Sequence, residues 1–310
     1  MNPPVFQRIA IIGAGLIGAS IARAAKAENA STVIALHDAD PDVRCRAKAL
    51  DLGDVEETAA AAAEGADCVF LCVPSGAMGE ATAACATGLA TGAILTDVGS
   101  VKASAITQMR EAAPGHVHLI PGHPIAGTEQ SGPEAGFASL FRDRWHILTP
   151  LAEHAADPDY ADALDRLSTF WSRLGARVDM MDADRHDRVL AITSHLPHLI
   201  AFNIVSTAHD MESVDEGEVV KYSAGGFRDF TRIAASDPVM WRDVFLNNKQ
   251  AVLEALGRFS EDLAALQRAI RWDDGDTLMR EFARARGIRK AIIEAGQDSA
   301  ETNFGRDKQD

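Results

Sequence analysis

The chain has 310 residues, a length for which two domains are the usual arrangement. Hydrophobic residues make up 47% of it and charged residues 24%, as in ordinary water-soluble globular proteins. Its formal charge is −15 and it has no concentrated run of basic residues. A binding surface for nucleic acids or anionic membranes is therefore not expected.

The cysteines and the N-terminus limit the function further. The cysteines contain no C-x-x-C pair, so neither a zinc site nor a redox pair is indicated. The N-terminus lacks a signal-peptide pattern, and no stretch approaches about 18 uninterrupted apolar residues. We therefore expect a cytoplasmic protein without a membrane partner.

Short apolar runs alternate with helical patterns through the first half of the chain. A helix of about two dozen residues is expected after the first run. Such alternation predicts an α/β fold with a doubly wound, Rossmann-type parallel sheet and right-handed crossovers. The runs that predict buried strands are residues 9–12, 33–36, 68–73, 93–98, 118–120, 146–149 and 178–181.

Helical patterns dominate the second half, so we expect an all-α domain there. Residues 185–206 are apolar on nearly every face, and Pro197 should kink this helix or remove one backbone hydrogen bond. Asp237 and Pro238 fit the N-cap and first position of another helix, whose apolar residues continue at helical spacing to Leu266. The expected domains are residues 1–182 and residues 183–310.

A glycine-rich run follows the first predicted strand and opens a helix, which is the context of a dinucleotide-binding turn. Residues 13–18 read G-x-G-x-x-G, in which the glycines allow a tight turn, close approach of a pyrophosphate and close packing of helix on strand. Asp38 ends the second strand, where a carboxylate accepts ribose hydroxyls and repels a 2′-phosphate. NAD is therefore favoured over NADP, although Arg44 keeps NADP open. The predicted cofactor-binding residues are Gly13, Gly15, Leu16, Ile17, Gly18, Asp38, Val73 and Pro74.

Two polar segments follow predicted strands, at the edge where open α/β sheets bind ligands. His123 lies in Gly122–Glu129, where Pro124 and a glycine predict an irregular loop after the run 118–120. It is either a structural histidine or a catalytic one. Ser100 lies between a strand and a helix, and is either an N-cap or a site residue.

The helical half adds further candidates. Ser194 and His198 share a helix face at i, i+4, and Arg228 and Arg232 lie one turn apart, as suits recognition of a carboxylate. Solvated or core roles are the alternatives. A metal site is not expected, because the i, i+3 spacing of His195 and His198 differs from that of zinc-binding helices.

Together these segments resemble the prephenate/arogenate (cyclohexadienyl) dehydrogenase family of tyrosine biosynthesis. The resemblance implies a nicotinamide-binding domain joined to a helical dimerisation domain, and therefore a homodimer. It implies NAD-dependent oxidative decarboxylation of prephenate to 4-hydroxyphenylpyruvate, of arogenate to tyrosine, or of both. The segments that carry it are Gly13–Gly18, Asp97–Lys102, Gly122–Glu129, Ser194–His198 and Gly226–Arg232.

The resemblance also assigns roles to single residues. It implies that His123 is the general base, that Ser100 forms a hydrogen bond with the substrate hydroxyl, and that Arg232 binds a substrate carboxylate. Arg228 stands where some relatives have lysine. The other residues that it places at the substrate pocket are Thr128, Glu129, Ser194, His195, His198, Gly225, Asp229 and Trp241.

Two other functions stay open from the sequence. A β-hydroxyacid dehydrogenase shares the domain arrangement but uses a lysine in a G-x-x-x-N-x-x-K helix, a run that this chain lacks. A non-catalytic NAD-binding sensor would not require His123, Ser194, His198 and Arg232 to converge. The sequence does not rank prephenate against arogenate, and we expect both to be accepted.

Overall fold

The computed structural model describes residues 3–128, 130–212 and 224–294. The chain divides into two compact units, residues 1–252 and residues 253–310. The first unit contains all the described strands and the first helices that follow them, so the change from strands to helices lies inside it.

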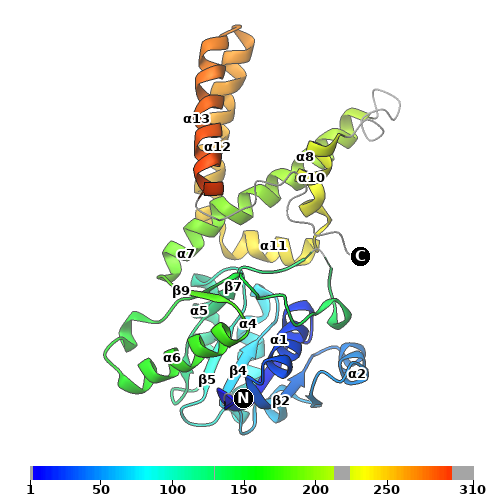
Figure 1. Cartoon of the computed structure of the whole chain (residues 1–310), viewed down its shortest axis with the longest axis vertical. Helices are drawn as coiled ribbons and strands as arrows, with labels where there is room; N and C mark the ends of the chain where they lie inside the picture. The colour runs from blue at the N-terminus through cyan, green and yellow to red at the C-terminus, as the bar shows by residue number, and fades with distance from the viewer. Residues whose placement is uncertain (1–2, 129, 213–223, 295–310) are drawn as a thin grey trace. The chain divides into compact units, whose positions relative to one another are not determined.

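A parallel sheet of six strands forms the centre of the first unit (Figure 1). Its order is β3-β2-β1-β4-β5-β6, so the chain winds outward in both directions from the neighbours β1 and β4. This confirms the doubly wound fold and places the switch point of the sheet between those two strands. The strands are β1 (Phe6–Ile12), β2 (Ser31–His37), β3 (Asp54–Val55), β4 (Cys68–Leu71), β5 (Ile94–Asp97) and β6 (His118–Leu119).

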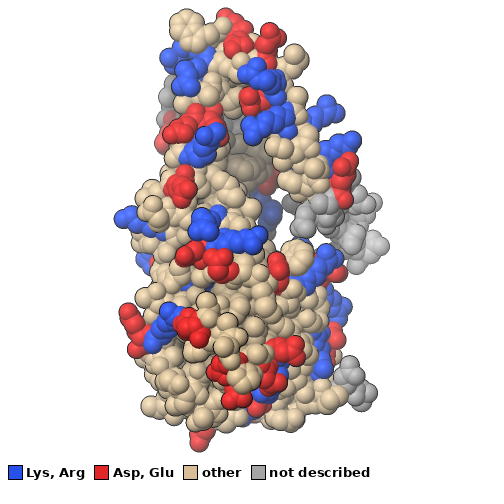
Figure 2. Space-filling view, turned by 90° about the vertical axis from the view of Figure 1, so that its left-hand side faces the viewer, with Lys and Arg blue, Asp and Glu red and all other residues tan. Residues whose placement is uncertain are grey.

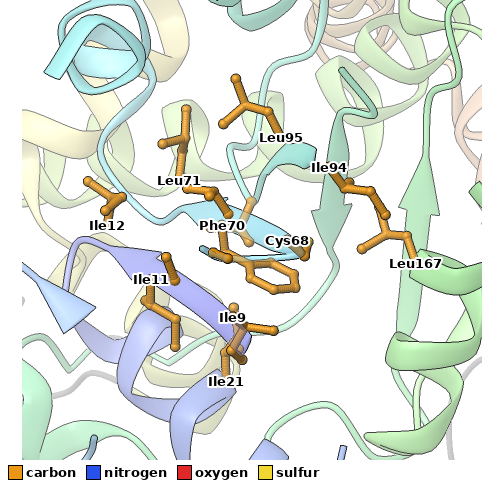
Figure 3. Close-up of a cluster of buried hydrophobic side chains, with 14 of the residues drawn as sticks. Ile9, Ile11, Ile12, Ile21, Cys68, Phe70, Leu71, Ile94, Leu95 and Leu167 are labelled. Atoms are coloured by element: carbon orange, nitrogen blue, oxygen red, sulfur yellow. The ribbon is translucent and has the colours of Figure 1, made fainter. Parts of the chain in front are cut away.

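Side chains of the central strands form the core shown in Figure 3. Ile9, Phe70 and Ile94 are fully buried in three adjacent strands. The Phe70 ring lies 5.1 Å from Phe170 and 5.9 Å from Trp171, between ring centroids. Burial of both sheet faces explains why these strands are continuous apolar runs.

Helices connect and cover the strands of this sheet. The first is half as long as expected, because Asn29 takes a left-handed φ of +49° and the Ala30 N–H bonds back to the Ala25 carbonyl, which ends the helix. The remaining helices follow the expected βα order. The helices are α1 (Leu16–Ala27), α2 (Pro41–Ala49), α3 (Ala59–Ala63), α4 (Met78–Cys85), α5 (Ala103–Ala112) and α6 (Pro158–Arg173).

A second, smaller sheet contains two strands expected in the first one, and it corrects the loop predicted around His123. Its strands are β7 (Gly122–Pro124), β8 (Trp145–Leu148) and β9 (Arg177–Met180), with β7 antiparallel and β9 parallel to β8. His123 pairs with Ile147 and is therefore held in a strand. The prediction failed because an apolar run indicates a buried strand without identifying its partners.

The long apolar segment of the helical half forms one continuous helix that is interrupted by a π-helical turn (Figure 1). It consists of α7 (Ala183–Leu190), a π-helical turn (Ala191–His195) and α8 (Leu196–Glu212). Pro197 has no N–H, and in the turn before it the Leu196 N–H bonds to the Ala191 carbonyl, five residues back.

The predicted long helix after Asp237 is two helices. The Asp237 carboxylate caps the first by accepting the Met240 N–H at 2.8 Å, as predicted. The break falls at Asn248, whose side chain bonds to other elements. The remaining helices are α10 (Gly225–Thr231), α11 (Pro238–Asn247), α12 (Lys249–Arg271) and α13 (Gly275–Glu294).

One described helix, Ala183–Met211, is long and apolar enough to cross a membrane by length and composition, with a mean hydropathy of 1.4. The core helix of a water-soluble protein has the same properties. His186, Asp187 and His195 are buried on this helix. They form hydrogen bonds with other protein groups, and 28% of the most apolar stretch of this helix is buried within the chain.

Charged side chains of both signs are interspersed on the face shown in Figure 2. Among the described residues of that face, no extended area carries basic side chains alone.

Candidate active site

The glycine run forms a turn at the carboxyl end of β1. Gly13 has a φ of +102°, and a Cβ there would lie 2.4 Å from the Cys72 carbonyl oxygen. A Cβ at Gly18 would lie 2.0 Å from the Gly13 oxygen, so helix and strand are in close contact. A Cβ at Gly15 would meet nothing within 4 Å. Gly15 thus borders open space at the N-terminus of α1, where free N–H groups favour an anion.

Asp38 lies beside this turn. Its carboxylate accepts the Ala14 N–H at 2.8 Å and the Asp40 N–H at 3.0 Å. The Arg44 guanidinium donates to the Asp38 carbonyl at 2.8 Å and pairs with Glu57 at 3.1 Å. The partners of the Arg44 guanidinium among the described residues are therefore backbone carbonyls and Glu57, and not the Asp38 carboxylate.

The other predicted cofactor residues lie close to the turn. Leu16 and Ile17 begin α1, and Val73 and Pro74 follow β4. All are at the carboxyl edge of the sheet, beside the switch point at which such folds bind ligands.

A buried ion pair joins the end of β5 to β7. The Lys102 ammonium pairs with Asp97 and donates to the Gly122 carbonyl at 2.6 Å. Asp97 also accepts the N–H groups of Gly99 and Gly122, at 2.8 and 3.2 Å. Burial lowers the pKa of Lys102, and the Asp97 charge opposes this shift. Lys102 and Asp97 thus hold the carbonyl and the N–H group of Gly122, the residue before His123.

His123 forms one end of a buried chain of three side chains. Its Nδ1 lies 2.9 Å from Nε2 of His186, and Nδ1 of His186 lies 2.8 Å from Oδ1 of Asp187. Asp187 also accepts the backbone N–H groups of Lys102 at 2.8 Å and Ala103 at 2.9 Å. The carboxylate of α7 thus caps α5.

These contacts correct one interpretation of Ser100. Helix α5 begins at Ala103, so Ser100 is not its N-cap, and Asp187 satisfies the N–H groups instead. Sequence reasoning missed His186 and Asp187, because the groups outside α7 that they contact lie 61 to 85 residues away along the chain.

Burial keeps the histidines of this region neutral. It lowers the pKa of His123 well below its usual value, and the nearby His186, Lys102, His195 and His146 lower it further. Burial also lowers the pKa of His195 to about 4, although the Asp187 charge opposes the shift. At neutral pH, His123 therefore has an unprotonated ring nitrogen.

The helical half brings Trp241 and two histidines to the same place. The His198 ring stacks on Trp241 at 3.7 Å, and His195 meets that indole edge-on at 6.1 Å. His198 Nδ1 lies 2.9 Å from the Ser194 carbonyl oxygen. Burial lowers the pKa of His198, the hydrogen bond to the Ser194 carbonyl opposes this shift, and the positive charge of Arg232 adds to it.

The Ser100 backbone lies near His195, whose Nδ1 contacts Asn248 at 3.1 Å and whose Nε2 is buried without a hydrogen-bond partner among the described residues. The charge of His195 also acts on His123. The structure therefore brings Ser194, His195, His198 and Trp241 into contact, and the charge effects of His195 on His123 and of Arg232 on His198 connect this group with the other two residues.

The other predicted substrate residues are more exposed. Thr128 is exposed and accepts the Gln130 N–H at 3.2 Å, and Glu129 lies outside the described residues. Gly225, Arg228 and Asp229 are exposed on α10. Within the described parts of the chain, no group of three or more His, Cys, Asp or Glu side chains is arranged to hold a metal ion.

Comparison with known families gives two matches that follow each other along the chain. Residues 21–180 match the nucleotide-binding domain of prephenate dehydrogenase. Residues 182–284 match the dimerisation domain of prephenate dehydrogenase. The change from one to the other falls where strands give way to helices.

Single proteins agree with these matches over almost the whole chain. The chain is 45% identical to the cyclohexadienyl dehydrogenase of Zymomonas mobilis, over 93% of this chain and 97% of that protein. It is 31% identical to the prephenate dehydrogenase of Bacillus subtilis, over 92% of this chain and 76% of that protein. Its fold is similar to the crystal structure of Aquifex aeolicus prephenate dehydrogenase in complex with hydroxyphenyl propionate and NAD+. The TM-score is 0.84 and the identity 32%, over 92% of this chain and 98% of that one.

Proposed function

Because the chain belongs to the prephenate dehydrogenase family, we propose that it oxidises and decarboxylates both prephenate and arogenate with NAD. The observation that carries this proposal is His123, a buried and neutral histidine on β7, which is hydrogen-bonded to the carboxyl end of β5 in the dinucleotide-binding sheet. Identity of 45% to a protein named cyclohexadienyl dehydrogenase supports the acceptance of both substrates. We place the reaction in the cytoplasm.

The residues of the glycine turn suit NAD. Gly15 borders open space that a Cβ would occupy, and the N–H groups of α1 face it without a side-chain cap. The Asp38 carboxylate would bind the adenosine ribose and disfavour a 2′-phosphate. NAD would supply a hydride acceptor beside the substrate ring. An Aquifex aeolicus relative was crystallised with NAD+, which supports this choice over NADP.

The side chains near His123 would divide the remaining work among them. His123 takes the proton of the ring hydroxyl as the ring C–H bond gives up its hydride. Ser100 orients that hydroxyl, and Arg232 binds a substrate carboxylate. The new carbonyl is vinylogous to the ring carboxylate, so carbon dioxide leaves, its bonding electrons stay in the ring, and the ring becomes aromatic. A positioned base of this kind contributes on the order of 10²–10⁴-fold.

We propose that the helical half makes the protein a homodimer. No described residue of α13 is buried within its own chain. Met279, Phe282 and Ile288 on that helix are each more than half exposed, at 67%, 58% and 53%. Large apolar side chains on one helix favour burial against a partner. A second copy fits, because the matched family domain is a dimerisation domain.

Reduction of the cofactor tests the proposed activity. The purified protein is mixed with NAD or NADP and with prephenate, arogenate or 3-hydroxyisobutyrate, and absorbance of the reduced cofactor is followed. We expect turnover of the first two substrates with NAD and carbon dioxide release in equal amount. Turnover of 3-hydroxyisobutyrate alone would favour a β-hydroxyacid dehydrogenase. Folded protein that binds NAD but reduces none would favour a sensor.

A further inference from the structure

We propose that His186 and Asp187 are positioning residues that fix the protonation state of His123 and take over the proton it accepts. This inference rests on the proposed function, in which His123 is the base. It adds two residues of α7 that lie outside every segment used to recognise the family. The observation that carries it is the buried chain His123–His186–Asp187, with contacts of 2.9 and 2.8 Å.

The carboxylate end of the chain sets the direction of every hydrogen bond. Asp187 accepts two backbone N–H groups, from Lys102 and Ala103. Burial raises the pKa of Asp187, but hydrogen bonds from His186 and from those N–H groups outweigh it and hold the pKa below its usual value. Asp187 is therefore ionised and only accepts. The proton between the two side chains belongs to Nδ1 of His186.

The tautomer of His123 follows from this direction. A neutral His186 that carries its proton on Nδ1 has a lone pair on Nε2. That lone pair accepts from His123, so the His123 proton sits on Nδ1. Nε2 of His123 then holds a lone pair, which is the form that a general base needs. His186 and Asp187 thus select one of the two neutral tautomers of His123, which are otherwise close in energy.

The same contacts allow the positive charge created by the accepted proton to move from His123 to His186. When Nε2 of His123 takes the hydroxyl proton, the ring is charged, and its Nδ1–H bond can break as a new N–H bond forms on Nε2 of His186. The positive charge then lies beside the ionised Asp187. No electrons are transferred in this step.

The charged groups around the two rings favour that transfer. His123 faces His186, Lys102, His195 and His146, all of which oppose a positive charge on it. His186 also faces Lys102, but the carboxylates of Asp187 and Asp97 favour its charged form. A proton is therefore held more easily on His186 than on His123.

Two substitutions of His186 separate tautomer selection from proton transfer. His186→Gln places an amide oxygen near the former Nε2, so it accepts from His123 Nδ1 but takes no proton at neutral pH. His186→Leu removes both abilities. Both variants leave Asp187 free to cap α5. We expect kcat to fall about tenfold in His186→Gln and about a hundredfold in His186→Leu, with KM within about threefold of wild type.

The pH profile gives a readout that a purely structural role would not move. Since His186→Gln removes the preferred place for the proton, the acid limb of kcat/KM should move to lower pH. The matched control is His146→Leu, another fully buried histidine that faces His123, stacked on Trp171 at 3.8 Å and outside the chain of hydrogen bonds. The His146→Leu variant should retain most of the wild-type kcat. Its main effect should be a lower thermal midpoint.

Ring ¹⁵N NMR of the histidines tests the inference without substrate. In wild type, His123 should be protonated at Nδ1 and bare at Nε2, and His186→Leu should give a mixture of tautomers. Protonation of wild-type His123 at Nε2, or an unchanged kcat and tautomer in His186→Leu, would overturn the proposal. Wild-type protein inactive on both substrates would refute the proposed function instead, and the NMR spectrum would still decide the tautomer.

Discussion

At the scale of single residues, the site depends on burying ionisable groups that stay hydrogen-bonded. His123 and His186 are neutral because burial disfavours their charged forms. Asp97 and Lys102 stay buried as a pair, and each finds further backbone partners. The polar groups of the site are thus held in place before any substrate arrives.

Buried histidines make stability depend on pH. The folded pKa of His195 is about 4, against an ordinary value of 6.5, and those of His123, His146 and His186 are lowered too. Below pH 6.5 the unfolded chain therefore binds protons that the folded chain does not. The free energy of unfolding should therefore be highest above pH 6.5. It should fall as the pH drops toward 4, by up to about 1.4 kcal/mol per pH unit for each histidine.

Urea unfolding measured at several pH values in this range checks that prediction. His195→Gln should show a shallower loss than wild type, because it removes one of the titrating groups. A free energy of unfolding that does not change between pH 6.5 and 4 would contradict the assignment of neutral, buried rings.

Arg232 should act through substrate affinity. Removing a guanidinium that binds a carboxylate costs about 1.5–3 kcal/mol, so Arg232→Ala should raise KM for prephenate roughly ten- to hundredfold and change kcat less. Steady-state kinetics measure both constants. Arg242→Ala, at an exposed residue paired with Asp243, is the control and should behave as wild type. An unchanged KM in Arg232→Ala would refute this role.

At the scale of elements, sequence patterns predicted the parallel strands and the glycine turn, because both depend on local sequence. They did not predict the partners of β7 and β8, or the break at Asn248, which follow from contacts distant in sequence. The site shows the same division. His123 was predicted from its segment, whereas His186 and Asp187 act through groups that only folding brings near.

Two glycines of the turn should respond to alanine in different ways. Gly13→Ala puts a Cβ against the Cys72 carbonyl at a positive φ and should cost about 1–3 kcal/mol of stability. Gly15→Ala meets open space, so its free energy of unfolding should change by less than about 1 kcal/mol. Its KM for NAD should rise about tenfold, because the Cβ fills the space for the pyrophosphate. Thermal unfolding and NAD titration distinguish the two, and equal stability losses would count against this account.

At the scale of the whole molecule, the apolar side chains that stay exposed point to assembly. No described residue of α13 is fully buried within its own chain, yet the helix carries the exposed apolar side chains Met279, Phe282 and Ile288. A chain of 33.1 kDa with such a helix is expected to pair, so that the surface left open in one copy is covered by the other.

Sedimentation equilibrium tests the pairing. Wild type should show twice the 33.1 kDa mass of one chain, and Phe282→Glu should shift it toward a single chain. Arg280→Glu, at an exposed polar position of the same helix, is the control and should stay dimeric. A wild-type protein that sediments as one chain, or a Phe282→Glu variant as dimeric as wild type, would contradict the proposed interface.

The catalytic role of His123 is the centre of the account, and the kcat of His123→Asn with prephenate and NAD tests it most directly. Asparagine keeps a polar side chain of similar reach but accepts no proton at neutral pH. We predict that kcat falls on the order of 10²–10⁴-fold, while KM and the thermal midpoint stay near wild type. A folded His123→Asn protein with the kcat of wild type would contradict the account.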